Sequence, residues 1–320
     1  MSKLGQRRRS RRGLALALLG VATITACDEV REIGERMETR TPHAEYAEAL
    51  KSAGLEQTAL GRDWLFSGDS ALAAPLEVTL PYRHEGTLVT NEAPALGLRF
   101  SLRRGQRLSV DVRMDSVQVM LLFIDLFRVS EDSGEAPRHI ESAEVRTTFL
   151  ETEARRDGDY LLRIQPELLR GGEYRLTISA DPSLAFPVAD RDQRAVRSYF
   201  GADRDAGRRR HQGIDIFAPR GTPALAVSAG FVRRVGTNFL GGNVVWVWDE
   251  ERGHSYYYAH LDSQAVTFGE RVHVGDTLGF IGNTGNARTT SPHLHFGIYA
   301  PGEGPVDPLP FVARPRSVVD

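Results

Sequence analysis

The segment 291–296, Ser-Pro-His-Leu-His-Phe, limits the possible folds more than any other part of the sequence. Its flanks, 280–282 and 296–299, are apolar and partly β-branched or aromatic, which predicts a strand. Because residues two apart on a strand point to the same face, His293 and His295 should project together while Leu294 packs into the core. Two imidazoles on one strand make half of a metal site. The other half, a histidine and a carboxylate, must come from elsewhere in the chain.

A second pattern, His211 followed by Asp215, offers that other half. The spacing HxxxD would also suit a helix, but Gly213 and the β-branched Ile214 and Ile216 argue against one. In an extended segment His211 and Asp215 share a face, and the two isoleucines lie on the opposite, buried face. We expect Gly213, between the two ligands, to leave room for an ion.

A further histidine, His260, follows three consecutive tyrosines and ends another strand-like run. Three neighbouring segments (221–230, 241–248 and 269–279) read as short strands joined by glycine turns, which predicts a compact all-β unit. These four histidines and one aspartate therefore lie on three strand-like pieces within about the last third of the chain.

Residues from about 196 to 311 resemble the lysostaphin/LytM-type zinc metalloendopeptidases of bacterial cell walls. The resemblance covers the HxxxD pair, the single histidine after aromatic residues and the HxH pair, in that order. It implies a barrel-sandwich β fold, a Zn²⁺ cofactor and peptide cross-links of peptidoglycan as substrate. By the same resemblance the metal ligands are His211, Asp215 and His295, and the catalytic pair is His260 and His293.

The chemistry of these residue types agrees with that implication. Catalytic zinc uses three protein ligands and keeps one position open for water. Two neutral imidazoles and one carboxylate leave the ion with a net positive charge, which lowers the pKa of the water. The sequence places no glutamate as the base of an HExxH enzyme, so histidines must accept the proton and stabilise the oxyanion.

Two other functional classes are compatible with parts of this pattern. Some related domains have lost metal ligands, bind peptidoglycan and activate cell-wall amidases; this chain lacks none of the three ligands. Segment 269–279 also resembles the hairpins of biotinyl and lipoyl carriers. Those carriers need an acceptor lysine on a turn, and the only lysines are Lys3 and Lys51, both far from this segment.

The N-terminus has the composition of a targeting segment. Five arginines between positions 7 and 12 precede an apolar stretch, 13–26, that is too short to span a bilayer. It ends in Ile-Thr-Ala-Cys27, which resembles the lipobox of bacterial lipoproteins, and Cys27 is the only cysteine. We expect residues 1–27 to be a lipoprotein-type signal peptide and lipid on Cys27 to anchor the protein in the cell envelope, at the periplasmic face of a membrane. An ordinary secretory signal, the export route and the choice between inner and outer membrane stay open.

The remaining chain divides by composition. Residues 28–74 read as a charged tether with one short helix over 42–54, which follows Thr41 as N-cap and has proline at its first position. Residues 75–181 alternate apolar and polar side chains in short runs, which predicts a small β-sandwich without catalytic groups. The pattern resembles the jelly-roll modules that accompany secreted bacterial peptidases, and whether this domain binds a protein partner stays open. Residues 182–195 read as a linker, and 196–314 as the metallopeptidase domain.

Net charge argues against one class of partner. The chain has 40 basic and 42 acidic residues, and its first 26 residues contain six basic groups and no acid, so the rest carries a net charge of −8. An acidic body gives no support to nucleic-acid binding.

Overall fold

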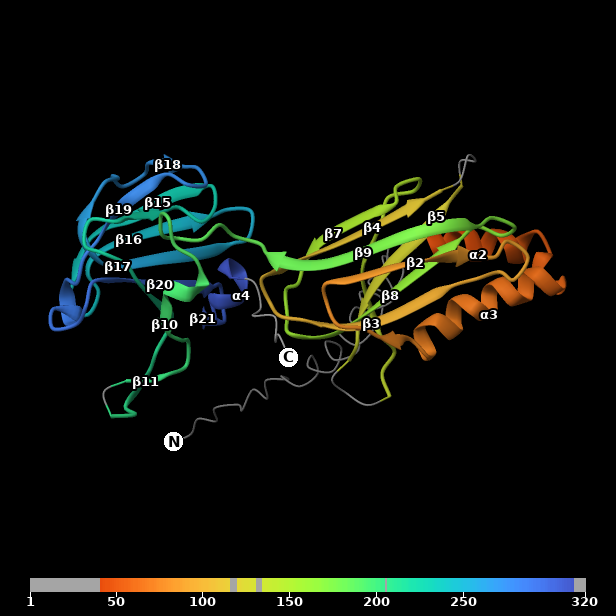
Figure 1. Ribbon diagram of the computed structural model, residues 1–320, viewed down its shortest axis with the longest axis horizontal. Helices are drawn as coiled ribbons and strands as arrows, with labels where there is room; N and C mark the ends of the chain where they lie inside the picture. The colour runs from red at the N-terminus through yellow and green to blue at the C-terminus, as the bar shows by residue number, and fades with distance from the viewer. Residues whose placement is uncertain (1–40, 116–119, 131–133, 205, 314–320) are drawn as a thin grey trace, which may run out of the picture.

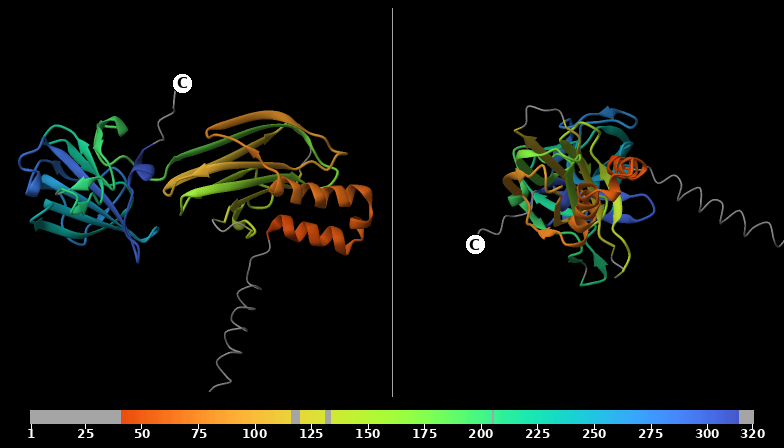
Figure 2. Two further views of the ribbon diagram at one scale, coloured as in Figure 1. Left: turned by 90° about the horizontal axis from the view of Figure 1, so that it is seen from below. Right: turned by 90° about the vertical axis from the view of Figure 1, so that its right-hand side faces the viewer.

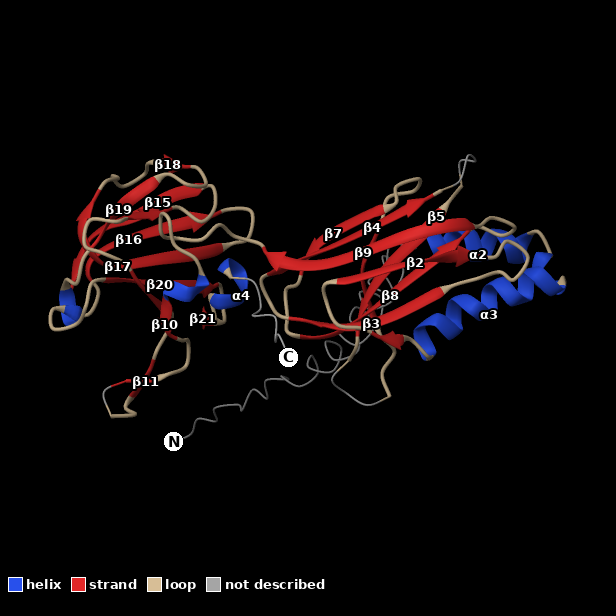
Figure 3. Ribbon diagram, viewed as in Figure 1, coloured by secondary structure: helices blue, strands red, loops and turns tan. Residues whose placement is uncertain are grey.

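The computed structural model describes residues 41–115, 120–130, 134–204 and 206–313. Two β units lie next to each other along the long axis of the molecule, with the two longer helices, α2 (Pro42–Ser52) and α3 (Ala59–Ala73), at the far end of the N-terminal unit (Figures 1, 2 and 3). The predicted signal peptide, Cys27 and the tether up to residue 40 lie outside the described residues. Within the described part, no helix has both the length and the apolar character needed to cross a membrane.

The predicted short helix is present as α2 (Pro42–Ser52). The side chain of Thr41 accepts a hydrogen bond of 3.1 Å from the Ala44 amide, and Pro42 occupies the first turn. These two features satisfy the exposed amides that a helix start would otherwise leave unpaired. A short 3₁₀ turn, η1 (Leu55–Gln57), follows Gly54, which has a left-handed backbone.

A second helix, α3 (Ala59–Ala73), was not predicted. It begins at Thr58, whose side chain accepts from the Gly61 amide, and it packs on the β-sandwich through Trp64, which is 1% exposed. The indole nitrogen of Trp64 donates to the carbonyl of Pro166 at 2.8 Å. Residues 41–74 are therefore a helical pair fixed to the sandwich. Packing against the sheet stabilises a segment that contains two glycines and has a weak pattern of its own.

Two sheets form the N-terminal unit and enclose one apolar core, which is the predicted β-sandwich; both are antiparallel except that the short strand β1 pairs parallel with β3. The five-stranded sheet has the order β1-β3-β8-β5-β6 and the four-stranded sheet the order β2-β9-β4-β7. From β2 to β9 the chain crosses to the other sheet at every step except β5 to β6, which pair within one sheet, and the first and last of these strands, β2 and β9, are neighbours. This is a jelly-roll arrangement. The strands are β1 (Leu76–Glu77), β2 (Tyr82–Leu88), β3 (Leu96–Leu102), β4 (Gln106–Met114), β5 (Leu122–Arg128), β6 (Arg138–Ser142), β7 (Phe149–Glu153), β8 (Gly158–Pro166) and β9 (Gly172–Pro182).

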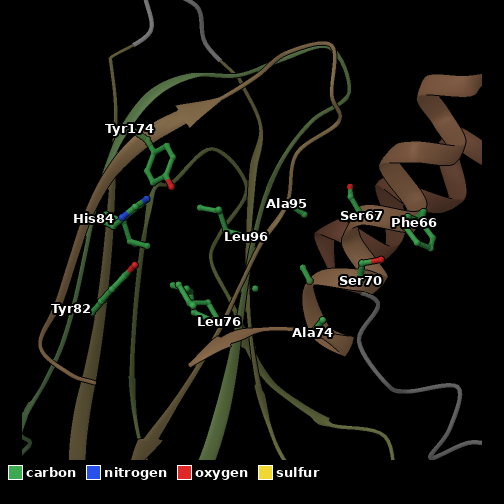
Figure 4. Close-up of a pocket in the computed structure, with 14 residues that line it drawn as sticks. Phe66, Ser67, Ser70, Ala74, Leu76, Tyr82, His84, Ala95, Leu96 and Tyr174 are labelled. Atoms are coloured by element: carbon green, nitrogen blue, oxygen red, sulfur yellow. The ribbon is translucent and has the colours of Figure 1, made fainter. Parts of the chain in front are cut away.

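A hollow of about 480 Å³ opens where the edge strand β2 faces α3. Tyr82, His84 and Tyr174 stand on one side, and Ser67 and Ser70 of α3 on the other (Figure 4). It lies in the N-terminal unit, and none of its lining residues belongs to the histidine cluster.

The C-terminal unit is the compact β domain that the sequence predicts. Its largest sheet follows the path β10-β13-β20-β17-β16-β15-β18, and this path stays open, so the described strands form no closed barrel. Further pairs join β14 to β19, β19 to β17 and β21 to β20. The elements are η2 (Gln193–Ala195), β10 (Val196–Ser198), β11 (Asp203–Arg204), β12 (Arg209–Arg210), β13 (Ile214–Phe217), β14 (Pro223–Leu225), β15 (Gly230–Asn238), β16 (Gly242–Asp249), β17 (His254–Gln264), β18 (Arg271–Val272), β19 (Thr277–Ile281), η3 (Gly285–Ala287), β20 (His293–Ala300), β21 (Gly304–Val306) and α4 (Leu309–Val312).

Residues 182–195, predicted as a linker, pack onto this domain instead of spanning open solvent. Leu184 and Val188 are buried in its core, and the Leu184 amide donates to the carbonyl of Phe311 at 2.8 Å. In the sequence, the arginines of this stretch obscure the few apolar residues that pack it against the domain. Gly105 of the sandwich lies so close to Phe311 that a Cβ would be 2.3 Å from the ring, so the two units are in direct contact.

Candidate metal centre

The three predicted metal ligands come together on two neighbouring strands and the loop before one of them. Strands β13 and β20 pair antiparallel with Asp215 opposite His295 and Phe217 opposite His293. Ile214, Ile216 and Leu294 point the other way and are fully buried. The alternation inferred from the sequence therefore holds for both strands, and it puts a carboxylate and an imidazole side by side.

The ligand atoms form a nearly equilateral triangle. Nε2 of His211, Oδ1 of Asp215 and Nδ1 of His295 are each 3.0 Å from the other two. Zinc bonds to nitrogen and oxygen are about 2.0–2.1 Å, so ligands of a tetrahedral ion lie about 3.3 Å apart. Among the described residues this is the one group of histidines and carboxylates close enough to hold an ion. Both the spacing and the donor types therefore fit zinc.

His211 approaches the site from a loop, which differs from the sequence-based expectation. It precedes β13 and follows β12, so the segment from His211 to Asp215 is not one continuous extended strand. The backbone of His211 pairs instead with loop 199–202, donating to Ala202 O and accepting from Gly201 N, both at 2.8 Å. Its Nδ1–H donates to the Tyr199 carbonyl at 2.9 Å, which leaves the lone pair of Nε2 facing Asp215 and His295.

Gly213 provides space for a ligand side chain, not directly for the ion as expected. A Cβ at this position would lie 2.4 Å from the carbonyl oxygen of Phe296 and 2.8 Å from Cε1 of His295. The imidazole of His295 thus occupies the room that a side chain at 213 would need. Glycine is required here because two strands and a ring meet at one point.

Asp215 is held as a carboxylate. Burial alone would raise its pKa, but hydrogen bonds and charge interactions with His211 and His295 outweigh burial and hold the pKa well below its usual range. Its second oxygen, Oδ2, accepts a hydrogen bond of 2.9 Å from the guanidinium of Arg204. Burial also lowers the pKa of His295. Asp215 therefore presents an anionic ligand and His295 a neutral one.

The predicted catalytic pair lies beside the triangle. The ring centroids of His260 and His293 are 5.0 Å apart, and His260 is 5.9 Å from His295. His260 donates from Nδ1 to the Thr284 carbonyl and His293 from Nδ1 to the Ser291 carbonyl, both at 2.9 Å. Both Nε2 atoms are thereby left as proton acceptors. Burial and the neighbouring His293 lower the pKa of His260 to about 4, so His260 is neutral near pH 7.

Backbone geometry at His260 explains how a strand delivers this ring. His260 has a positive φ of 63°, and the register of β17 against β16 shifts between Tyr258 and Leu261, the stretch that contains it. The register of β17 against β19 shifts just after it, between Leu261 and Ser263. A left-handed backbone in a residue other than glycine costs about 1–3 kcal/mol and tends to occur at functional sites. The His260 amide donates to Gly241 O at 2.7 Å and its carbonyl accepts from Gly282 N at 3.1 Å, which holds the bulge in place.

These five residues lie in a groove of about 620 Å³. One wall is aromatic: Trp246 lies 4.4 Å from Tyr257 and 5.0 Å from Tyr299 between ring centroids, and Tyr257 is 5.8 Å from His295. Neither these aromatic residues nor Arg204 was predicted from the sequence to take part in the site. Strand alternation could have found Tyr257: Tyr256 and Tyr258 are buried in the core, so Tyr257 between them must point away from the core. Nothing local in the sequence marks Arg204 among the arginines around it.

Comparison with known proteins identifies the C-terminal region. Residues 209–308 match the model of Peptidase family M23. The chain is 40% identical over 87 residues to glycyl-glycine endopeptidase ALE-1 of Staphylococcus capitis (27% of this chain, 24% of that protein). It is 34% identical over 137 residues to the L-Ala--D-Glu endopeptidase of Bacillus subtilis (39% and 42%). It is 41% identical over 88 residues to the peptidoglycan DD-endopeptidase ShyC of Vibrio cholerae (27% and 19%).

Among solved structures, the catalytic domain of lysostaphin from Staphylococcus simulans is 31% identical with a TM-score of 0.33, covering 36% of this chain and 89% of that one. The chain spans less than half the length of the curated relatives named above. The likeness thus concerns the C-terminal domain, and the jelly-roll unit lies outside the family match.

Proposed function

We propose that this chain, whose C-terminal domain belongs to the lysostaphin/LytM type of peptidase family M23, is a zinc-dependent endopeptidase that hydrolyses peptide cross-links of bacterial peptidoglycan. The observation that carries the proposal is the complete triangle of ligand atoms, each pair 3.0 Å apart, beside two further imidazoles with free Nε2 atoms. The names of three relatives support the substrate class, since they cleave glycyl-glycine, L-Ala–D-Glu and peptidoglycan DD bonds.

His211, Asp215 and His295 would hold the metal. A zinc ion in this position would supply Lewis acidity, which lowers the pKa of bound water and polarises a carbonyl group. His260 and His293 line the same groove, and Nδ1 of each donates to a backbone carbonyl, which leaves the Nε2 atoms for catalysis. One Nε2 can take the proton of the attacking water while the other, once protonated, donates to the developing oxyanion. The carbonyls of Thr284 and Ser291 fix the orientation of these two rings.

The aromatic wall gives the groove a surface for an extended peptide. Trp246, Tyr257 and Tyr299 line the groove, with Tyr257 next to His295, and small or apolar parts of a peptide can pack on this wall. We also propose that the protein is exported and anchored at the envelope through lipid on Cys27, because its N-terminal sequence has the order of a lipoprotein signal. This location would bring the groove to its substrate.

The test is digestion of purified peptidoglycan by the full chain in mild detergent, with and without a chelator, followed by mass analysis of the released fragments. The wild type should release peptide-cleaved fragments, and chelation should stop the release. His295→Ala should lose the metal, because one of three ligands is gone. His293→Ala should keep the metal and lose about 10²–10⁴-fold in turnover.

His273→Ala is the matched control, since the side chain of His273 is 74% exposed and far along the chain from every ligand. It should retain both metal and turnover. A wild type that binds zinc, releases no fragments and stimulates an amidase would replace the peptidase proposal with the activator alternative. If His293→Ala lost the metal as fully as His295→Ala, the assigned roles would be wrong.

A further inference from the structure

Arg204 reaches the metal ligands from outside the predicted site. It lies on β11, in a small hairpin that projects from the domain near the groove (Figure 1). One guanidinium nitrogen donates to Oδ2 of Asp215 at 2.9 Å and to Oγ of Ser198 at 2.5 Å. The side chain of Arg204 is 30% exposed and that of Asp215 12%, so water competes only in part for this contact.

Through Ser198, the same guanidinium nitrogen of Arg204 is also linked to a second metal ligand, His211. Oγ of Ser198 lies 3.3 Å from Nδ1 of His211, beside the stronger bond of 2.9 Å that this nitrogen makes to the Tyr199 carbonyl. Arg204 therefore contacts Asp215 directly and His211 through one hydroxyl group. The third ligand, His295, is bonded to Asp215 at 3.0 Å.

Two effects of this arginine oppose each other. Its charge lies near the ion position and would weaken cation binding by repulsion. Its hydrogen bond holds Oδ2, which fixes the rotation of the carboxylate and keeps Oδ1 in the triangle. Groups that orient metal ligands in this way typically contribute about 10–100-fold in metal affinity. Solvent access weakens the repulsion, whereas the hydrogen bond is short and specific, so orientation should dominate.

We propose that Arg204 is a positioning residue of the metal centre: it orients Asp215 and His211 and thereby sets the zinc affinity of the site. The inference rests on the proposed function in one respect, that zinc is the occupant. Arginine suits this role because the two N–H groups of that one nitrogen point in directions fixed by the planar guanidinium, one toward a hydroxyl and one toward a carboxylate. A lysine ammonium keeps the charge and loses that geometry.

The experiment measures the zinc dissociation constant of the full chain by competition with a chromophoric chelator. Arg204→Ala and Arg204→Lys should both weaken zinc binding by about 10–100-fold. Pure electrostatics predicts the opposite for Arg204→Ala, which would bind zinc more tightly, and near-wild-type affinity for Arg204→Lys. Either of these two results would overturn the inference.

Arg210→Ala is the matched control. Arg210 lies on the same hairpin and pairs with Asp203 at 2.5 Å, but it makes no bond to a ligand, and its side chain is 71% exposed. The zinc affinity of Arg210→Ala should stay within about twofold of wild type if the affinity depends on the orientation of the ligands and not on the hairpin itself.

Thermal unfolding of the metal-free proteins separates positioning from folding. The unfolding midpoints of metal-free Arg204→Ala and metal-free wild type should agree, because the contact serves the metal. If Arg204→Ala and Arg210→Ala both unfolded at a midpoint lower than wild type by the same amount, Arg204 would have a structural role instead. Arg204 variants with wild-type zinc affinity would overturn the inference and leave the peptidase proposal standing. Weakened zinc binding in the Arg204 variants, together with a wild type that binds zinc and cleaves no peptidoglycan, would support the inference and overturn the peptidase proposal. A wild type that binds no zinc would overturn both.

Discussion

Replacing Gly213 with alanine should disable the metal centre without adding or removing any ligand. The backbone of Gly213 is not in the left-handed region, so alanine meets no conformational barrier there. The new Cβ would instead lie 2.4 Å from the Phe296 carbonyl oxygen and 2.8 and 2.9 Å from Cε1 and Nε2 of His295. Normal contacts of this kind are about 3.5 Å, so the misfit is about 1 Å.

The magnitude follows from what can move. The Phe296 carbonyl belongs to the central strand β20, so the strand pair β13–β20 must separate or the His295 ring must turn away. Overpacking of this kind costs about 1–3 kcal/mol, which exceeds the about 0.4–1 kcal/mol that alanine gains by restricting the unfolded chain. A shift of about 1 Å in a catalytic group can lower turnover about 100-fold.

The assay compares Gly213→Ala with Gly236→Ala in zinc affinity, peptidoglycan turnover and unfolding midpoint. Gly236 is the control because a Cβ there meets no atom within 4 Å and its φ is likewise not positive. Gly236→Ala should match wild type in all three measurements. Gly213→Ala should bind zinc more weakly and lose about 100-fold in turnover. Full zinc affinity and turnover in Gly213→Ala would refute the packing argument.

Three further outcomes are expected. Gly97→Ala should destabilise the protein by about 1–3 kcal/mol in urea unfolding, because its Cβ would lie 1.7 Å from the Ala71 carbonyl of α3; unchanged stability would contradict this packing. Burial and the charge of Arg163 lower the pKa of His43 to about 4, below the usual 6.5. As the pH drops from 6.5 to about 4, His43 is therefore protonated in the unfolded chain before it is protonated in the folded one. The free energy of unfolding should fall over this range by up to about 3 kcal/mol. His43→Gln should show a flatter pH profile in urea unfolding, and an identical slope would count against this assignment. Cys27→Ala should move the protein from the membrane to the soluble fraction, and equal membrane retention would argue against lipidation.

The sequence by itself determined those features that depend on neighbours along the chain. Alternation around Leu294 placed His293 and His295 on one face, and the buried Ile214 and Ile216 placed Asp215 on the matching face of its strand. The same alternation predicted the sandwich strands. These predictions needed only the period of a strand and the preference of apolar side chains for the core.

Only the tertiary structure decided how the pieces meet. His211 joins the site through loop 199–202 and not through an extended strand, and His260 reaches the groove through a bulge with φ of 63°. Arg204 lies in the β11–β12 hairpin and contacts Asp215 on β13. Each of these depends on partners that local periodicity does not encode: His211 and His295 are 84 positions apart, yet their ligand atoms lie 3.0 Å from each other. Sequence alternation fixes which face a side chain takes, whereas distances across strands are set by pairing register, bulges and packing.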